Sequence, residues 1–335
     1  MKRNVITVTA LAASVLFGFS SAQAAIVDLY TSPAVNGAGG TFSAAVDSAV
    51  VSTSFYNGSG GTTNAALLIG DQYFPGSPGL SGSSSGSGTY TRMYAIQDAM
   101  ARTPGVERGF NSNDGALWDQ KNGVGVPAFT IADTSIINYQ GTDYVEILFD
   151  GHQSNSAISL DQLMIFKAPG DINLNTFEAA NPTPTTKQIT DAFAAQGATV
   201  VYSLDSTDSS GNVTTNNTVL LHTLGGSGHG DNAFYIPVSA ITGGTTADLN
   251  DRVYVWSQMG GLGTYTLSSG SLSGTTVNFS ANSTPEEYAY YKGGTSILTA
   301  VPEPTAYAAG VLLLLFIGFS ERRRLAAWLK SSLKF

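Results

Sequence analysis

The sequence predicts an all-β fold: an antiparallel β-sandwich of the jelly-roll type. About a dozen short apolar or alternating runs follow one another at near-regular spacing, with turn residues between them, and only one stretch has helical spacing. The regular alternation of strand and helix that a parallel sheet needs is missing. The composition is typical of turn-rich β proteins, with 38 glycines and 12% charged residues, and its 10% of aromatic residues is too high for a disordered chain.

Four segments are expected along the 335 residues. Residues 1–25 form a signal peptide and residues 26–292 a β-sandwich ectodomain, in which residues 75–125 are a variable, loop-rich region. Residues 293–301 are a linker, and residues 302–335 are a C-terminal tail with a membrane helix. The body is long enough for one large domain.

The N-terminus has the three parts of a secretory signal. Lys2 and Arg3 give a basic start, residues 5–19 are mostly apolar, and Ala22-Gln23-Ala24 is a small-x-small cleavage site. Signal peptidase is therefore an expected partner, and the mature chain is expected to begin at or near Ala25.

Turn signals divide the first part of the predicted body. Strands are expected at residues 26–30, 41–55 (one long strand or two), 65–69 and 89–96. The Gly/Ser/Pro-rich residues 75–88 predict a loop. The stretch that runs on to Gly125 is irregular, which is typical of functional or disordered loops.

The second part of the body has clearer periodicity. The best strand is 143–150, where Val145, Ile147 and Phe149 share one face. Residues 186–196 have helical spacing and predict a short helix. In residues 157–167 the alternation places Ile158, Leu160, Met164 and Phe166 on one face and Leu163 and Ile165 on the other. Further strands are expected at 126–132, 198–204, 218–222, 233–239, 252–258, 264–267 and 275–279, and 286–291 is expected to be a tyrosine-rich edge.

The tail combines an extended motif, an apolar run and a basic end. Pro302, Glu303 and Pro304 cannot continue a regular helix. An apolar run follows over residues 306–319, and we expect a membrane helix over 306–320. That run is shorter than the roughly 20 residues a spanning helix prefers, so a buried core helix is the alternative. The basic stop that follows, Arg322, Arg323 and Arg324, favours a membrane helix under the positive-inside rule.

This order of parts resembles the PEP-CTERM sorting signal of exported proteins in Gram-negative bacteria. The resemblance covers residues 301–324 and implies that Pro302, Glu303 and Pro304 are recognised by an exosortase, a membrane enzyme of transpeptidase type. It further implies that the tail is removed and the body released or attached at the cell surface. The chain departs from the family pattern in the eleven residues that follow Arg324. A looser resemblance of residues 143–261 to exported PEP-CTERM proteins implies a sandwich without implying chemistry.

Composition excludes several classes of function. The chain has no cysteine, so thiol catalysis and thiolate metal sites are excluded. Between the two terminal signals there are 8 basic and 22 acidic residues, a formal net charge of −14. Nucleic acid is therefore not an expected partner. Divalent cations or a neutral extracellular polysaccharide fit this charge better, although net negative charge also keeps an exported protein soluble.

One polar cluster is a candidate calcium site. Asp171, Asn173 and Asn175 alternate along the chain, and Glu178 follows three residues later, so side-chain oxygens are available in a turn. The spacing is not that of an EF-hand, which would need a glycine at the sixth position and a glutamate at the twelfth. Asp150 or Asp161 are candidates for additional ligands. The alternative is that these residues form Asx turns without a metal, so no cofactor is required.

The sequence shows no catalytic motif in the structural setting that its chemistry needs. Glu146, Asp150, Asp161 and Glu178 are the carboxylates considered for glycoside hydrolysis. Glu146 and Asp150 share a strand face but are about 13 Å apart at the rise of a strand, too far for either hydrolytic geometry. The histidines at 152, 222 and 229 are expected to be separate residues. Aromatic residues considered for stacking on sugars are Trp118, Trp256, Tyr288, Tyr290 and Tyr291, with Trp256 favoured as a core residue.

The sequence thus predicts a non-enzymatic protein that passes through the inner membrane and ends at the cell surface or in the extracellular matrix. A structural, adhesive or polysaccharide-contact role is expected. The alternatives are a secreted polysaccharide-active enzyme and a permanently membrane-anchored protein.

Overall fold

The structure is a computed structural model. It describes residues 26–31, 48–58, 62–70, 90–98, 103–112, 117–121, 128–139, 141–153, 156–223, 230–243, 247–268 and 272–292. The predicted signal peptide, linker, membrane helix, sorting motif (Pro302, Glu303, Pro304) and basic stop (Arg322, Arg323, Arg324) lie outside the described residues.

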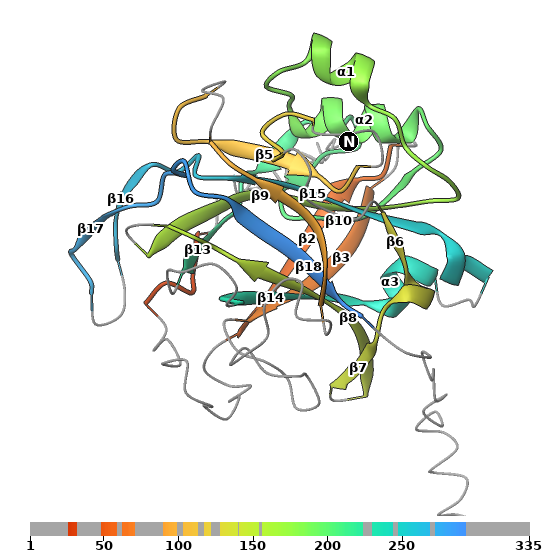
Figure 1. The fold of residues 1–335 in the computed structure, drawn as a ribbon, viewed down its shortest axis with the longest axis horizontal. Coiled ribbons are helices and arrows are strands. Elements are labelled where there is room, and N and C mark those ends of the chain that lie inside the picture. Colours follow the sequence, from red (N-terminus) through yellow and green to blue (C-terminus); the bar gives the residue numbers. More distant parts are fainter. Residues whose placement is uncertain are drawn as a thin grey trace, which may run out of the picture.

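Two seven-stranded sheets make up most of the described body (Figure 1). Sheet A has the order β1 (Ile26–Asp28), β13 (Thr218–His222), β9 (Ala157–Ala168), β15 (Arg252–Met259), β5 (Glu107–Phe110), with β10 (Thr199–Ser203) paired to β9 and β6 (Phe129–Thr130) to β15. Sheet B has the order β2 (Ser48–Tyr56), β3 (Thr62–Gly70), β14 (Asn232–Pro237), β8 (Thr142–Asp150), β18 (Glu286–Tyr291), β4 (Tyr90–Ile96), with β7 (Ile136–Tyr139) paired to β8. The predicted all-β class is confirmed.

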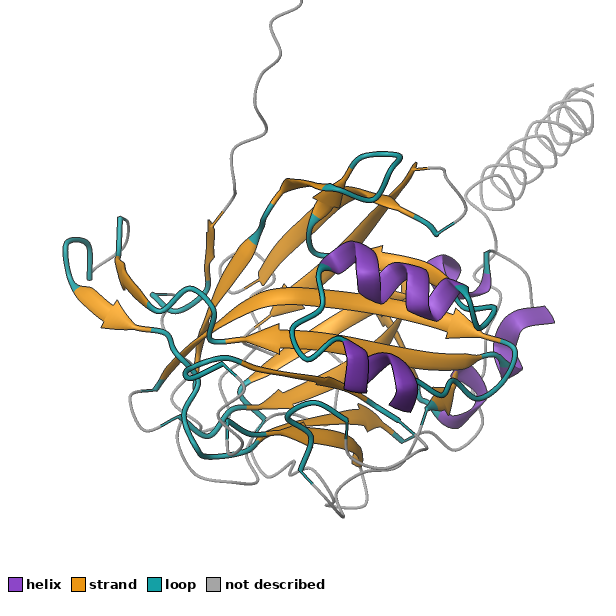
Figure 2. Ribbon diagram, turned by 90° about the horizontal axis from the view of Figure 1, so that it is seen from above, coloured by secondary structure: helices purple, strands orange, loops and turns teal. Residues whose placement is uncertain are grey.

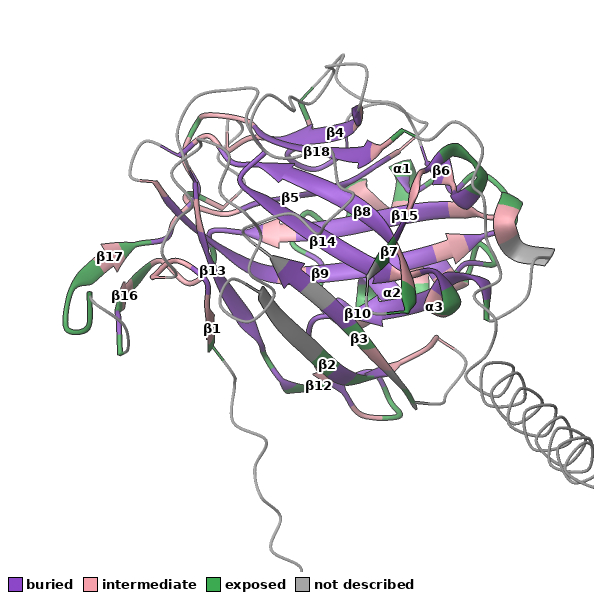
Figure 3. Ribbon diagram, turned by 90° about the horizontal axis from the view of Figure 1, so that it is seen from below, coloured by how far each residue is buried: buried purple, intermediate pink, exposed green. Residues whose placement is uncertain are grey.

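Smaller elements decorate these sheets. They are the ribbons β11 (Ser206–Thr207) with β12 (Val213–Thr215) and β16 (Thr264–Thr266) with β17 (Thr276–Asn278), the helices α1 (Asn175–Ala180), α2 (Thr186–Ala194) and α3 (Val238–Thr242), and the 3-10 turns η1 (Ile131–Asp133) and η2 (Ala247–Asn250). The β16–β17 ribbon is largely exposed, whereas the strands of the two sheets are mostly buried (Figure 3). Among the described strand pairs only β1–β13 is parallel.

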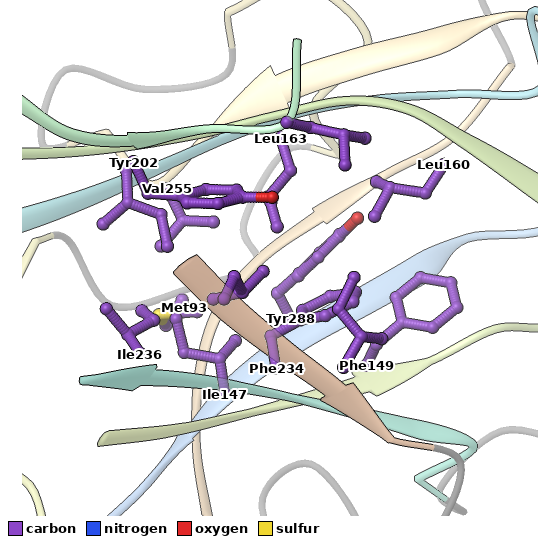
Figure 4. Packing of buried hydrophobic residues seen from close by; sticks show 14 of the residues in the cluster. Met93, Ile147, Phe149, Leu160, Leu163, Tyr202, Phe234, Ile236, Val255 and Tyr288 are labelled. Carbon is purple, nitrogen blue, oxygen red and sulfur yellow. The ribbon is translucent and has the colours of Figure 1, made fainter. Parts of the chain in front are cut away.

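The main core lies between the sheets. In β8, Val145, Ile147 and Phe149 point inward as their alternation predicts, and each is fully buried. They meet inward-facing side chains of sheet A such as Leu163 and Val255 (Figure 4). Burial of this apolar surface is the main favourable term that holds the sheets together.

The faces of β9 differ from the prediction. Ile158 and Leu160 lie in the main core, but so do Leu163 and Ile165, whereas Met164 and Phe166 face the other way. The cause is a β-bulge, because Gln258 pairs with Gln162 while the next residue of β15 pairs with Leu160. One extra residue in a strand reverses the alternation beyond it. The extra residue is Asp161.

A second core covers the outer face of sheet A. Met164 and Phe166 pack there with Trp256, Phe193 and Trp118. The helices α1 and α2 lie across this face of the sheet (Figure 2), and Phe193 of α2 stacks on Phe166 with ring centroids 3.9 Å apart. Sheet A is therefore buried on both faces, which explains why β15 and β9 are apolar nearly throughout.

Several predicted boundaries were wrong. Residues 286–291 form an interior strand of sheet B, since β18 pairs with both β8 and β4. The irregular stretch before Gly125 contains β5. Within the range predicted as a strand over 126–132, the described residues form a two-residue strand followed by η1, and the strand predicted over 233–239 ends at Pro237, just before α3.

The predicted helix is confirmed as α2, and its start is set by a capping box. Thr185 Oγ1 accepts a hydrogen bond from the Gln188 N–H, and Gln188 Oε1 accepts one from the Thr185 N–H at 2.9 Å. We expect Thr185→Ala to lower the free energy of unfolding by about 1 kcal/mol, because it leaves helical N–H groups without an acceptor. Thermal unfolding of the full chain measures this change. Thr264→Ala, at an exposed ribbon position, is the control, and equal effects of the two variants would contradict the capping role.

Candidate functional site: a buried carboxyl pair between the sheets

Two glutamates from different sheets meet inside the body. Glu107 begins β5 at one end of sheet A, and Glu286 begins β18 in sheet B. Both side chains are 0% exposed. Inward alternation explains Glu286, since Tyr288 and Tyr290 of the same strand also lie in the main core. Glu107 is held at its place by pairing with Met259 of β15.

The carboxyl groups of this pair are hydrogen-bond partners of each other. Neither oxygen of Glu107 makes a hydrogen bond of ordinary geometry to an N–H or hydroxyl group of the described residues. Glu286 differs, because its Oε1 accepts from Gln153 Nε2, and the backbone at His152 also favours its charged form. Two carboxyl groups can share a hydrogen bond only if one of them keeps its proton. The donors around Glu286 therefore assign the negative charge to Glu286 and the proton to Glu107.

Electrostatics around the pair agree with that assignment. Burial, followed by the charge of Glu286, raises the pKa of Glu107 well above its ordinary value. Burial also raises the pKa of Glu286, to about 7, against the lowering effect of its hydrogen bonds. None of the described cationic side chains forms an ion pair with either glutamate. An uncompensated buried carboxylate is costly, so the protonated form is favoured.

Tyrosines line the neighbouring interior. Tyr94 of β4 stacks on Tyr288 with ring centroids 4.5 Å apart and planes within 3° of parallel. The Tyr94 hydroxyl is 3.0 Å from Ser257 Oγ, and the Tyr288 hydroxyl donates to Met259 Sδ at 3.1 Å. Burial raises the pKa of both hydroxyls. Both tyrosines are thus neutral groups beside the pair.

A close backbone packing fixes the ends of the strands that carry the pair. The Ala281 N–H donates to the Gly105 carbonyl at 2.8 Å, joining the segments that precede β18 and β5. Gly260 fills the space beside this bond: a Cβ added to it would lie 2.2 Å from the Gly105 carbonyl oxygen and 2.3 Å from the Ala281 nitrogen. Only glycine fits here.

Two further buried acids, whose pKa values are also raised, lie apart from the pair. Asp161, at the bulge of β9, accepts hydrogen bonds from the Gly261 N–H and from Ser159 Oγ, and burial raises its pKa to about 6. Asp205 accepts from the Asn217 N–H and from Thr186 Oγ1, and burial raises its pKa to about 7.

The candidate calcium residues occupy a turn before and within α1. Asp171 forms an ion pair with Arg252 at 3.1 Å. Asn173 Oδ1 accepts from the Asn175 N–H, an Asx turn that leads into the helix, and Glu178 lies within the helix. The described residues contain no group of three or more His, Asp or Glu side chains placed to hold a metal. Calcium binding at these residues stays a prediction.

The carboxylates considered for hydrolysis are spread over three elements. Glu146 and Asp150 lie on β8 in sheet B, Asp161 on β9 in sheet A, and Glu178 on α1. Glu146 is fully buried and accepts a hydrogen bond from the Tyr90 hydroxyl.

The aromatic residues considered for sugar stacking were mostly assigned wrongly to the surface. Trp118, Trp256, Tyr288 and Tyr290 are buried, and Tyr291 is only partly exposed. The expectation that Trp256 is a core residue is confirmed. Trp118 donates from Nε1 to the Asn181 carbonyl at 3.0 Å, so it is part of the packing of α1.

The sequence prediction missed the carboxyl pair. The alternation of Glu286, Tyr288 and Tyr290 was a usable signal for an inward glutamate. Glu107 had none, because its stretch shows no strand period. Chemically, the pair can hold and release one proton. With no exposed surface, it is not open to a substrate in this conformation.

Comparison with protein-family models, with curated proteins and with solved structures found no match. Within the described ranges, no helix is long and apolar enough to span a bilayer. The predicted membrane helix at 306–320 lies beyond those ranges.

Proposed function

We propose that this chain is an exported cell-surface or extracellular-matrix protein, sorted through its C-terminal Pro-Glu-Pro segment, with a structural, adhesive or polysaccharide-contact role for its body. The proposal includes a signal peptide at residues 1–25, a membrane helix at 306–320 and a jelly-roll order of the strands. Its processing partners are signal peptidase and an exosortase-type membrane enzyme, and an extracellular polysaccharide is the proposed ligand.

The observation that carries the proposal is that every described strand pair lies between the two expected cleavage points. Strand β1 starts at Ile26, just past the small-x-small motif. The last described residue, Lys292, bridges Thr134 and lies ten residues before Pro302. Cleavage near Ala25 and near Pro304 would therefore leave every described strand pair intact. Strand pairing that needs neither terminus suits a protein that is processed at both ends during export.

Intact-mass analysis of the protein from its native host tests the sorting proposal. The expected product runs from about Ala25 to about Pro304, because the tail is needed only until an exosortase handles it. A mass that includes residues 305–335 would contradict processing and support a permanently anchored protein. A chain that keeps residues 1–25 would contradict export by a cleaved signal.

A glycan-binding screen of the same product, with and without calcium, tests the role of the body. Retention on an extracellular polysaccharide is the expected result. Retention that requires calcium would also support a site at Asp171, Asn173, Asn175 and Glu178. Turnover of a polysaccharide during the screen would favour the secreted enzyme instead.

A further inference from the structure

We propose that Glu107 and Glu286 bind one proton between them, and that this shared proton is a pH-dependent latch that joins sheet A to sheet B. The inference goes beyond the proposed function and does not depend on it. It rests on the burial of both side chains, on their mutual hydrogen bond and on their origin in different sheets.

The step at the latch is a simple ionisation. With the proton in place, Glu107 donates through its hydroxyl to the carboxylate of Glu286. When the proton leaves for bulk water, two carboxylates face each other at hydrogen-bond distance in the interior. Like charges in a region of low polarity repel strongly, and each also loses its hydration. The released state is relieved only if the two strands separate enough to admit water.

Surrounding groups do not replace the lost proton. Asp119, from the segment 117–121, adds a further negative charge that raises the pKa of Glu107. Tyr94 of β4 and Tyr288 of β18 are neutral, and Ser257 of β15 is engaged with Tyr94. The side-chain amide of Gln153 and the backbone at His152 stabilise the charged form of Glu286, not that of Glu107. Among the described groups around Glu107, only the backbone of Asp98 favours its charged form, and this effect is the smallest of those acting on its pKa.

The segment expected to open is the one that carries β5. This strand has four residues, lies at an end of sheet A, and pairs in the described chain only with β15. The hydrogen bond from Ala281 to Gly105 and the carboxyl pair link it to sheet B, and the segment 117–121 forms a third link. The Asp119 N–H donates to the Arg108 carbonyl of β5, and the Asp119 carbonyl accepts from the Gln97 N–H, next to β4. We therefore expect β5 and the segment 117–121 to open together, before the rest of the domain unfolds.

The sign of the pH dependence follows from proton binding. The shared proton lies on Glu107, whose pKa is raised well above the ordinary value of glutamate, 4.5, so above pH 4.5 the folded chain binds more protons than the unfolded chain. Stability from this proton is therefore fully present below pH 4.5 and is lost as the pH rises from there through the raised pKa of Glu107. This is opposite to the behaviour of an ordinary ion-paired carboxylate.

Hydrogen exchange and thermal unfolding of the full-length chain, in mild detergent, test the latch. From pH 5 to pH 8 we expect Tm to fall by about 5–10 °C. Exchange in peptides covering residues 103–112 and 281–291, corrected for the pH dependence of the chemical rate, should rise about tenfold or more. Glu107→Gln keeps a donor to Glu286 at every pH and should abolish this local rise.

Asp205→Asn is the matched control. It removes another buried acid whose pKa is raised to about 7 and which lies away from β5. It should therefore reduce the pH dependence of Tm while leaving the local rise in exchange unchanged. An equal rise at residues 103–112 in Glu107→Gln and the unmodified chain would overturn the proposal, as would no rise in the unmodified chain. Calcium-dependent stabilisation that Glu107→Gln removes would also overturn it, since a cation would then occupy the place of the proton.

If Glu107→Gln does not fold, infrared spectroscopy of the carboxyl bands tests the shared proton without that variant. In the Asp161→Asn, Asp205→Asn background, a protonated carboxyl band should persist at pH 6.5 and disappear only as the pH rises through the raised pKa of Glu107. A band that is already absent at pH 5 would contradict the shared proton.

Discussion

Gly260→Ala is expected to lower the free energy of unfolding by about 2–5 kcal/mol. The backbone of Gly260 has φ +84°, a left-handed conformation that costs other residues about 1–2 kcal/mol. The added Cβ would also overlap the Gly105 carbonyl oxygen and the Ala281 nitrogen, and overpacking of this kind costs about 1–3 kcal/mol. Since both obstacles are backbone atoms, no side-chain rotation relieves them.

Thermal or denaturant unfolding of the full chain measures this loss, and Gly141→Ala is its control. Gly141 has nearly the same φ, +81°, but an added Cβ there would meet nothing within 4 Å. Its loss should stop at the conformational cost of about 1–2 kcal/mol. If the two alanine variants lose the same stability, the close packing of Gly260 against the segments leading to β5 and β18 does not contribute to the free energy of unfolding.

Trp256→Ala is the second large effect that we expect, again about 3–5 kcal/mol. Trp256 is fully buried at the centre of the second core. Its ring meets Trp118 edge to face, with centroids 4.9 Å apart, and its Nε1 donates to Gln162 Oε1 at 3.2 Å. Removal of the indole would leave a cavity between sheet A and its covering elements. A loss of this size is a large part of the 5–15 kcal/mol typical of a folded domain.

Trp256→Phe separates packing from hydrogen bonding. It keeps an aromatic ring in the cavity but gives up the indole N–H, so we expect a loss of about 1–2 kcal/mol in urea unfolding. If Trp256→Ala were as stable as Trp256→Phe, the neighbouring side chains would have to fill the space left by the indole. That result would contradict the expected cost of a cavity in the second core.

How much of this protein could be predicted depends on the range of the interactions involved. The inward face of β8 and the helix α2 were predictable, because strand alternation and helical spacing are local patterns. The faces of β9 beyond Asp161 were not, since the bulge becomes visible only in the pairing with β15. Nor was the burial of Trp118, whose position depends on packing against Trp256 and Phe177, which are far away in the sequence.

The candidate site shows the same division. Glu286 lies on a strand that the sequence predicted, and its inward direction follows from the alternation of that strand. Its partner could not be found in the same way, because Glu107 lies 179 residues earlier in a stretch without periodicity. The meeting of the two carboxyl groups depends on two chain segments that are joined by a backbone hydrogen bond between Ala281 and Gly105.

The sequence by itself determined the all-β class, the helix that begins at residue 186 and the absence of thiol chemistry, because each depends on residue type or on spacing within one segment. Only the tertiary structure decided which glutamates meet, which tryptophans are buried and where the alternation of β9 reverses. These depend on contacts between residues that are distant in the chain, and the free energy of such contacts is set by burial and pairing across sheets, which no local pattern contains.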